Sequence, residues 1–120
     1  MPKILIAEDD KMMDDMYRKK FSDSGFEVFI ALNEKETFDI IEKEKIDVVL
    51  VSLLMNGFEI VKKIRKDGSN PNMKIIITGY HDIQEDEDMS IEVGADAFVN
   101  KSHTTPSELL AKTKKLMEKQ

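Results

Sequence analysis

Five residues with reactive or charged side chains stand at the end of, or just after, short apolar runs: Glu8, Asp9, Ser52, Thr78 and Lys101. The runs have the length and β-branched composition of buried strands. When parallel strands form one sheet, their carboxyl ends meet at one edge, where ligands of open α/β proteins bind. Two acids, two hydroxyls and an amine at such an edge indicate a site for a divalent cation and a phosphate-like group.

The apolar runs that must position these residues recur along the whole chain. They indicate strands over residues 3–7, 26–31, 47–52, 74–78 and 97–99. The third contains an uninterrupted apolar stretch, typical of a central strand buried on both faces. Apolar residues between the runs recur at helical spacing. Strands that alternate with helices predict a parallel sheet covered by helices on both faces, with right-handed crossovers.

Capping residues mark the starts of the intervening helices. Asp10 precedes the first helix, and Asn33 opens a capping box at the second. The third and fourth helices are expected over residues 58–66 and 82–93. Thr105 starts the last helix, with proline next and glutamate three residues later.

Composition limits the classes of protein to which the chain can belong. Its 120 residues, 41% of them hydrophobic, suit one domain with one modest core. A net charge of −6 argues against nucleic-acid binding through a basic surface. The absence of cysteine excludes disulfides and thiolate metal sites. The two histidines, His81 and His103, are too few for a histidine-rich metal site and are expected in exposed loops.

We expect neither a signal peptide nor a membrane span from this sequence. No apolar run approaches the ~20 residues of a membrane span. The first residues also lack the pattern of a signal peptide. We therefore expect a cytoplasmic protein, a single free-standing module over residues 1–120 that binds neither nucleic acid nor membrane. Its oligomeric state stays open.

Four segments together resemble the receiver domain of two-component response regulators, the CheY-like family. They are KILIAEDD at the start, IDVVLVS in the middle, and KIIITGY and GADAFVNK further on. The resemblance extends over essentially the whole chain. It implies a flavodoxin-like (βα)5 three-layer sandwich around a five-stranded parallel sheet of order 2-1-3-4-5. It also implies that the protein acts in phosphorelay signal transduction and is not an enzyme.

By position, the resemblance implies a role for each residue at the strand ends. Glu8 and Asp9 match the acidic pair that holds Mg²⁺, and Thr78 and Lys101 match the hydroxyl and lysine that meet the phosphoryl group. Phe98 matches the aromatic residue that changes rotamer on activation. The family's protein partners, a histidine kinase or a downstream regulator, would contact the face made by residues 82–93, 97–99 and 105–117.

The sequence departs from the family pattern at three places. The phosphoacceptor aspartate falls on Ser52, whose hydroxyl cannot form an acyl phosphate and is a poor nucleophile without an adjacent base. Only residues 53–55 separate it from Asn56-Gly57, where the family has a longer loop that supplies a metal ligand. Ser102 follows Lys101 where the family has proline, often with a cis bond. We therefore expect no catalytic residue, no required cofactor and at most weak Mg²⁺ binding.

Three functional hypotheses follow. The first is a degenerate receiver that acts as a protein-interaction module without aspartyl phosphorylation. The second keeps the switch with another input, either phosphorylation of Ser52, Glu8 or Asp9, or an anion between Thr78 and Lys101. The third is a small flavodoxin-like enzyme or nucleotide binder. It is disfavoured because the sequence has neither a glycine-rich phosphate loop nor a recognisable nucleophile–base pair.

Each candidate residue also has a purely structural interpretation. The acidic pair would be a solvated loop and helix cap, Ser52 a vestige or a hydrogen-bonding filler, and Phe98 an ordinary half-buried aromatic. Thr78 and Lys101 would be inherited without a present task. The acidic run over residues 85–88 would be a solvated helix face, with a docking face as its functional alternative.

Overall fold

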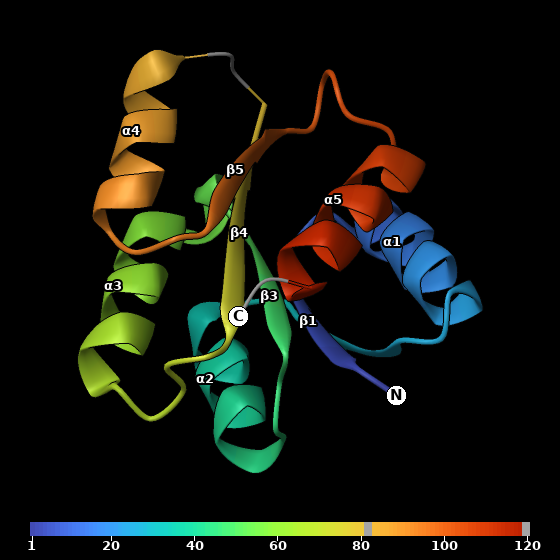
Figure 1. Cartoon of the computed structure of the whole chain (residues 1–120), viewed down its shortest axis with the longest axis horizontal. Helices are drawn as coiled ribbons and strands as arrows, with labels where there is room; N and C mark the ends of the chain where they lie inside the picture. Colours follow the sequence, from blue (N-terminus) through green and yellow to red (C-terminus); the bar gives the residue numbers. More distant parts are fainter. Residues whose placement is uncertain (81–82, 119–120) are drawn as a thin grey trace.

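The computed structural model describes residues 1–80 and 83–118. Figure 1 shows a central sheet with helices on both sides. His81 and the first residue of the expected helix 82–93 lie outside the described residues. Strands and helices alternate in the order β1 (Lys3–Ala7), α1 (Lys11–Asp23), β2 (Glu27–Ala31), α2 (Glu34–Lys43), β3 (Val48–Ser52), η1 (Leu53–Met55), α3 (Gly57–Asp67), β4 (Lys74–Gly79), α4 (Gln84–Glu92), β5 (Ala97–Asn100) and α5 (Pro106–Glu118).

The sheet has the predicted architecture. Its five strands are all parallel and follow the order β2-β1-β3-β4-β5. The predicted strands differ from the observed ones by at most one residue at either end. All five residues of β3 are buried, which confirms it as the central strand. This topology brings the carboxyl ends of all the strands to one edge.

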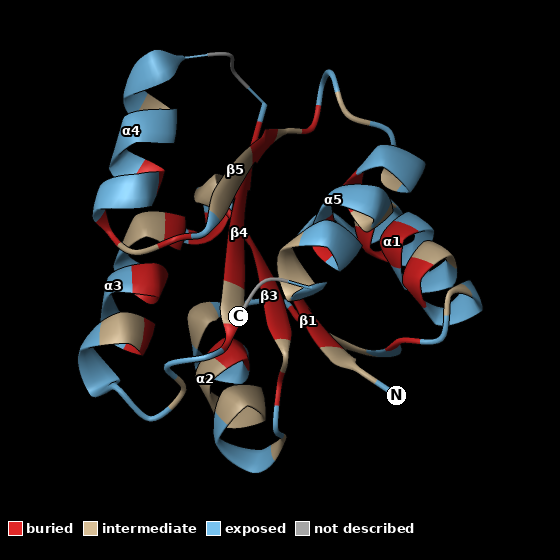
Figure 2. Ribbon diagram, in the orientation of Figure 1, coloured by how far each residue is buried: buried red, intermediate tan, exposed pale blue. Residues whose placement is uncertain are grey.

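Side chains along each strand alternate between two cores, one on each face of the sheet. In β1, Ile4 and Ile6 belong to the core that includes residues of α1 and α5, whereas Leu5 and Ala7 belong to the core that includes residues of α3. Figure 2 shows the buried strands between helices whose outer surfaces are exposed. Because both faces are covered, the central strands read as continuous apolar runs.

The expected helix starts are present. Asp10 accepts hydrogen bonds from two backbone N–H groups in the first turn of α1. Thr105 and Glu108 form a reciprocal capping box, with N···O distances of 3.1 and 2.9 Å. Asn33 accepts from the N–H of Glu36 at 2.8 Å, but the carboxylate of Glu36 turns back one residue earlier than the expected box. Local capping chemistry therefore positions α1, α2 and α5.

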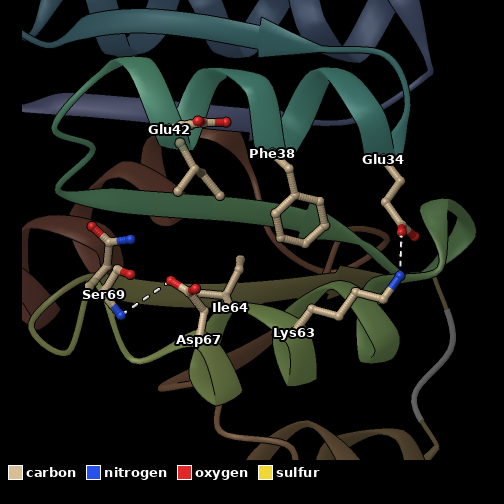
Figure 3. A pocket seen from close by; sticks show the side chains of 9 residues that line it. Glu34, Phe38, Glu42, Lys63, Ile64, Asp67 and Ser69 are labelled. Atoms are coloured by element: carbon tan, nitrogen blue, oxygen red, sulfur yellow. Dashed lines mark hydrogen bonds and ion pairs between the residues drawn. The ribbon is translucent and has the colours of Figure 1, made fainter.

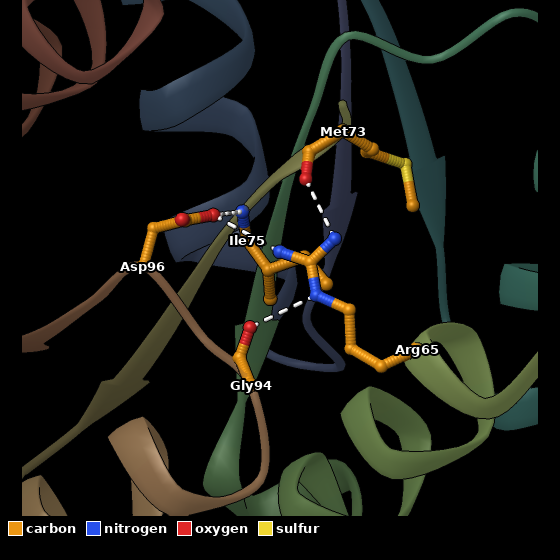
Figure 4. Close-up of polar contacts among 5 residues, drawn as sticks. All are labelled: Arg65, Met73, Ile75, Gly94 and Asp96. Atoms are coloured by element: carbon orange, nitrogen blue, oxygen red, sulfur yellow. Dashed lines mark hydrogen bonds and ion pairs between the residues drawn. The ribbon is translucent and has the colours of Figure 1, made fainter. Parts of the chain in front are cut away.

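A guanidinium group joins α3 to the amino ends of β4 and β5, the edge of the sheet opposite the strand-end residues (Figure 4). Arg65 donates from Nε to the carbonyl of Gly94 at 2.9 Å and from Nη1 to the carbonyl of Met73 at 3.0 Å. Its Nη2 lies 3.1 Å from Oδ2 of Asp96, which also accepts from the N–H of Ile75 at 2.8 Å. This Arg65 clasp was not predicted from the sequence.

Candidate functional site

The predicted strand-end residues come together at the carboxyl edge of the sheet. Ser52 and Thr78 are register partners in β3 and β4. Glu8 directly follows β1, and Lys101 directly follows β5. These four residues are buried, whereas Asp9 is exposed. The solvated-loop interpretation therefore holds for Asp9 and is wrong for Glu8.

Glu8 and Lys101 form a buried ion pair. Nζ of Lys101 lies 2.7 Å from Oε2 of Glu8, and their side chains are only 1% and 4% exposed. The ammonium group also lies 4.3 Å from the centroid of the Tyr80 ring, a cation–π distance. Because a buried charge needs a partner, and Ser52 carries no charge, the carboxylate of Glu8 provides that partner.

Hydrogen bonds to the carbonyls of Gly79 and Tyr80 hold the start of the segment after β5 in this position. The backbone N–H of Lys101 donates to the carbonyl of Gly79 at 2.7 Å, and the hydroxyl of Ser102 donates to the carbonyl of Tyr80 at 3.0 Å. No cis peptide bond occurs within residues 1–80 and 83–118, so the bond between Lys101 and Ser102 is trans. Replacement of the family's proline thus leaves the Lys101 side chain in the site.

The hydroxyl of Ser52 is hydrogen-bonded to the backbone. Its Oγ accepts a hydrogen bond from the N–H of Leu54 at 3.2 Å and caps η1. This single 3₁₀ turn, followed by Asn56 in the left-handed conformation with φ 64°, makes the short connection to α3. A Cβ at Gly57 would lie 3.0 Å from the carbonyl oxygen of Ser52, so the tight turn requires glycine there. These contacts match the interpretation of Ser52 as a hydrogen-bonding filler.

Asp14, on α1, is a buried acid that the sequence analysis missed. It is 3% exposed, and neither of its carboxylate oxygens has a hydrogen-bond partner in the described part of the chain. Burial, together with the charges of Glu8 and Asp10, raises the pKa of Asp14 to about 7. The spacing of Asp10, Asp14, Tyr17 and Phe21 places all four on one helix face, a signal that was available in the sequence.

The environment of Glu8 also affects a neighbouring tyrosine. Burial, with a smaller effect of the Glu8 charge, raises the pKa of Tyr17 above its ordinary value. Oε1 of Glu8, the oxygen not bound to Lys101, has no partner among the described residues. The pocket therefore contains several buried acceptor oxygens and a single buried lysine.

Phe98 lies half-buried on β5 beside the site. A Cβ built on Gly79 would lie 3.0 Å from Cζ of Phe98 and 3.2 Å from Cδ1 of Leu53. The ring thus fills space that any larger residue at position 79 would occupy. Its role as a switch stays a prediction.

The donor set does not fit the Mg²⁺ site that the resemblance implied. Mg²⁺ needs near-octahedral oxygen ligands. One oxygen of Glu8 is bound to an ammonium group, Asp9 is exposed, and the Ser52 hydroxyl is neutral and hydrogen-bonded. Within the described ranges, no group of three His, Cys, Asp or Glu residues is arranged to hold a metal ion. The expectation of at most weak Mg²⁺ binding by Glu8 and Asp9 stays a prediction.

A hollow of about 650 Å³ lies away from these residues, between α2 and α3 (Figure 3). Phe38 and Ile64 line it, and Lys63 pairs with Glu34 across one end at 2.6 Å. The predicted site residues do not line this hollow. The hollow is therefore separate from the strand-end residues.

No helix within residues 1–80 and 83–118 combines the length and the apolar character needed to cross a bilayer.

Comparison with known proteins identifies the family of this fold and site. The family model for the response regulator receiver domain matches residues 4–114. Three solved structures are similar over nearly their whole length. The receiver domain of the Francisella response regulator 1452 has 27% identity and a TM-score of 0.89, with 98% of each chain covered. A CheY-like receiver domain protein from Methanospirillum hungatei has 30% identity and a TM-score of 0.88, covering 98% of this chain and 94% of that one.

The third structure is the chemotaxis response regulator CheY4 of Vibrio cholerae. It has 25% identity and a TM-score of 0.89, with 97% of this chain and 98% of that chain covered. A fourth match, to NtrX from Brucella abortus, spans 98% of this chain but only 26% of that protein. The same fold thus occurs both alone and within longer chains.

Proposed function

Since the chain belongs to the family of response regulator receiver domains, we propose that it signals through protein contacts without aspartyl phosphorylation. Receiver domains work in signal transduction by interacting with kinases and effectors, and this general role applies here. The observation that carries the finer proposal is Ser52, a buried hydroxyl bound to the backbone at the phosphoacceptor position. A serine hydroxyl cannot form the acyl phosphate on which the family's switch depends.

The surroundings of Ser52 support the same proposal. A serine nucleophile needs an adjacent general base, and the hydrogen bond found for its Oγ is to a backbone N–H. Lys101, the expected phosphoryl partner, is already paired with Glu8 at 2.7 Å. We therefore propose no catalytic activity for this site.

The proposed contact surface is the face made by residues 83–93, 97–99 and 105–117. α4 carries an acidic first turn, with Glu85 and Glu87 exposed. Ile83 and Ile91 at its two ends are 46% and 57% exposed. An acidic face with exposed apolar residues suits a protein partner that offers basic and aliphatic side chains. A histidine kinase or a downstream regulator is the expected class of partner.

The alternative, a switch with another input, has less support. Ser52 and Glu8 are only 1% and 3% exposed, so a kinase would have to unfold the site to reach them. An anion between Thr78 and Lys101 would have to compete with Glu8 for the ammonium group. We therefore favour an interaction module over a serine-phosphorylated or anion-driven switch.

A phosphorylation assay tests the proposal. The wild type and the Ser52→Asp variant would be incubated with acetyl phosphate and Mg²⁺, and their intact masses measured. We expect no phosphoryl adduct on the wild type and an acid-labile adduct on Ser52→Asp. Ser52→Ala is the matched control, since it separates modification at position 52 from modification elsewhere. A phosphoryl group on wild-type Ser52, Glu8 or Asp9 would overturn the proposal.

A further inference from the structure

Lys101 is the one buried lysine or arginine among the residues that the structure describes. Its ammonium group lies 2.7 Å from Oε2 of Glu8 and 4.3 Å from the Tyr80 ring centroid. The backbone N–H of Lys101 and the hydroxyl of Ser102 are hydrogen-bonded to the carbonyls of Gly79 and Tyr80. The cation therefore lies against a carboxylate and an aromatic ring, on a backbone held to the end of β4.

Of the acids near this ammonium group, Glu8 is the one that pairs with it. Asp9 is exposed, and Oδ1 of Asp10 accepts hydrogen bonds from two backbone N–H groups in the first turn of α1. Glu8 and Asp14 are the buried acids of the described residues, and three of their four carboxylate oxygens have no hydrogen-bond partner there. With serine at position 52, Glu8 and Asp14 are the two buried carboxylates of the described residues, and Lys101 is bound to one of them.

We propose that the Lys101 ammonium is the resident cation of this pocket, bound to Glu8 where a receiver would otherwise bind a divalent metal ion. A tethered cation does not dissociate from the protein, so a metal ion competes with a local ammonium group at every metal concentration. A divalent ion would have to displace the ammonium from Glu8 or share the pocket with it, and like charges at close range repel. The single positive charge of Lys101 balances the single negative charge of the Glu8 carboxylate with which it pairs.

The inference rests on the proposed function in one respect, that this pocket is no longer a phosphorylation site. It assigns the exclusion of a divalent ion to the position of Lys101 and not to the residue at position 52 alone. It therefore makes a distinct prediction. Removal of the Lys101 charge should convert the pocket into one that binds divalent cations, with Ser52 unchanged.

Mn²⁺ is a suitable probe, because its paramagnetism reports binding without any phosphoryl donor. Water-proton relaxation would be measured on the full chain as wild type, Lys101→Met and Lys101→Met/Glu8→Gln. We expect no saturable binding to the wild type up to about 10 mM, and binding by Lys101→Met at least about tenfold tighter. The double variant should lose that gain. Lys112→Met, at an exposed position on α5, controls for the change in net charge.

Two results would overturn the inference: saturable Mn²⁺ binding by the wild type at Glu8, or a folded Lys101→Met variant with no gain. If Lys101→Met does not fold, wild-type NMR decides the matter. We then expect Mn²⁺ to leave the amide signals of Glu8, Tyr80 and Lys101 unbroadened, and selective broadening there would refute the proposal. Because no phosphoryl donor is present, this outcome is independent of the phosphorylation assay.

Discussion

Glu8 and Lys101 are 93 residues apart in the sequence, yet Oε2 of one and Nζ of the other lie 2.7 Å apart in the buried strand-end pocket. The pair joins the end of β1, near the middle of the sheet, to the end of β5 at its edge. Both residues were expected at this site, but each with a different partner. With serine at position 52, no carboxylate there competes with Glu8 for the ammonium group.

Loss of the lysine should destabilise the protein strongly. Lys101→Met leaves the Glu8 carboxylate buried without its counter-ion, which typically costs about 3 to 5 kcal/mol of unfolding free energy. Urea unfolding followed by circular dichroism would measure the change. Adding Glu8→Gln to Lys101→Met should restore part of the stability, because the uncompensated charge is removed.

The partly exposed pair Lys3–Glu44, with a distance of 2.9 Å, provides a matched control. Lys3→Met should cost less than about 1 kcal/mol, because solvent screens that interaction. Equal losses of unfolding free energy for Lys3→Met and Lys101→Met would mean that the buried pair stabilises the fold no more than the partly exposed pair does.

Asp14 should make stability depend on pH in the direction opposite to most carboxyl groups. Its pKa is raised from an ordinary value of 3.8 to about 7, chiefly by burial, so the folded protein binds its proton more tightly than the unfolded chain. Its contribution is therefore complete below about pH 4 and is lost as the pH rises towards 7. The difference between the two pKa values corresponds to a loss of roughly 4 kcal/mol.

Asp14→Asn removes this titration. We expect the difference in unfolding free energy, wild type minus Asp14→Asn, to fall as the pH rises from about 4 to about 7 and to stay constant above about pH 7. Asp15→Asn, at an exposed position next to it, is the control and should follow the wild type. A constant difference between the wild type and Asp14→Asn across this range would show that Asp14 titrates normally.

Much of the fold was predictable from the sequence because its signals are local. Apolar runs and capping residues placed every strand to within one residue at either end. The carboxyl-edge site was predictable as well, because parallel strands must end together. The residue types at those ends, including Ser52 and Lys101, could therefore be assigned to one site without a structure.

The partners of those residues were not predictable, because they depend on side-chain directions and on long-range packing. Neighbouring acids at a strand end point to opposite sides, and the sequence does not say that Glu8 turns inward while Asp9 turns to solvent. Asp14 was overlooked because acids on helices are normally exposed. Arg65 was overlooked because its partners are backbone carbonyls, which carry no sequence signal.

The Arg65 clasp should contribute measurably to stability. Arg65→Lys keeps the charge but loses the planar set of donors that reaches Gly94, Met73 and Asp96 together, so we expect a loss of about 1 to 3 kcal/mol. Thermal unfolding would measure it. Lys66→Met, next in sequence and exposed, should be nearly neutral. If both variants unfold alike, the clasp has no energetic role.

Gly94 should be intolerant of a side chain because of the same clasp. Its φ of +109° disfavours other residues, and an added Cβ would lie 2.7 Å from Cγ of Arg65. We expect Gly94→Ala to lower the unfolding free energy by about 1 to 3 kcal/mol. In an Arg65→Ala background the steric part should disappear, which leaves only the backbone strain. Strictly additive losses would indicate that Arg65 moves aside freely.

Gly79 and Phe98 provide a direct test of how tightly the proposed switch residue is held. Gly79→Ala would place a methyl group 3.0 Å from Cζ of Phe98 and 3.2 Å from Cδ1 of Leu53, closer than ordinary packing allows. We expect a loss of about 1 to 3 kcal/mol and a changed aromatic NMR signal for Phe98. Phe98→Leu in the same background should recover part of the stability, because the smaller side chain leaves room for the added methyl group. If Gly79→Ala leaves both stability and the Phe98 signal unchanged, the ring does not occupy this position in solution, and Phe98 is free to move as the family's switch aromatic does.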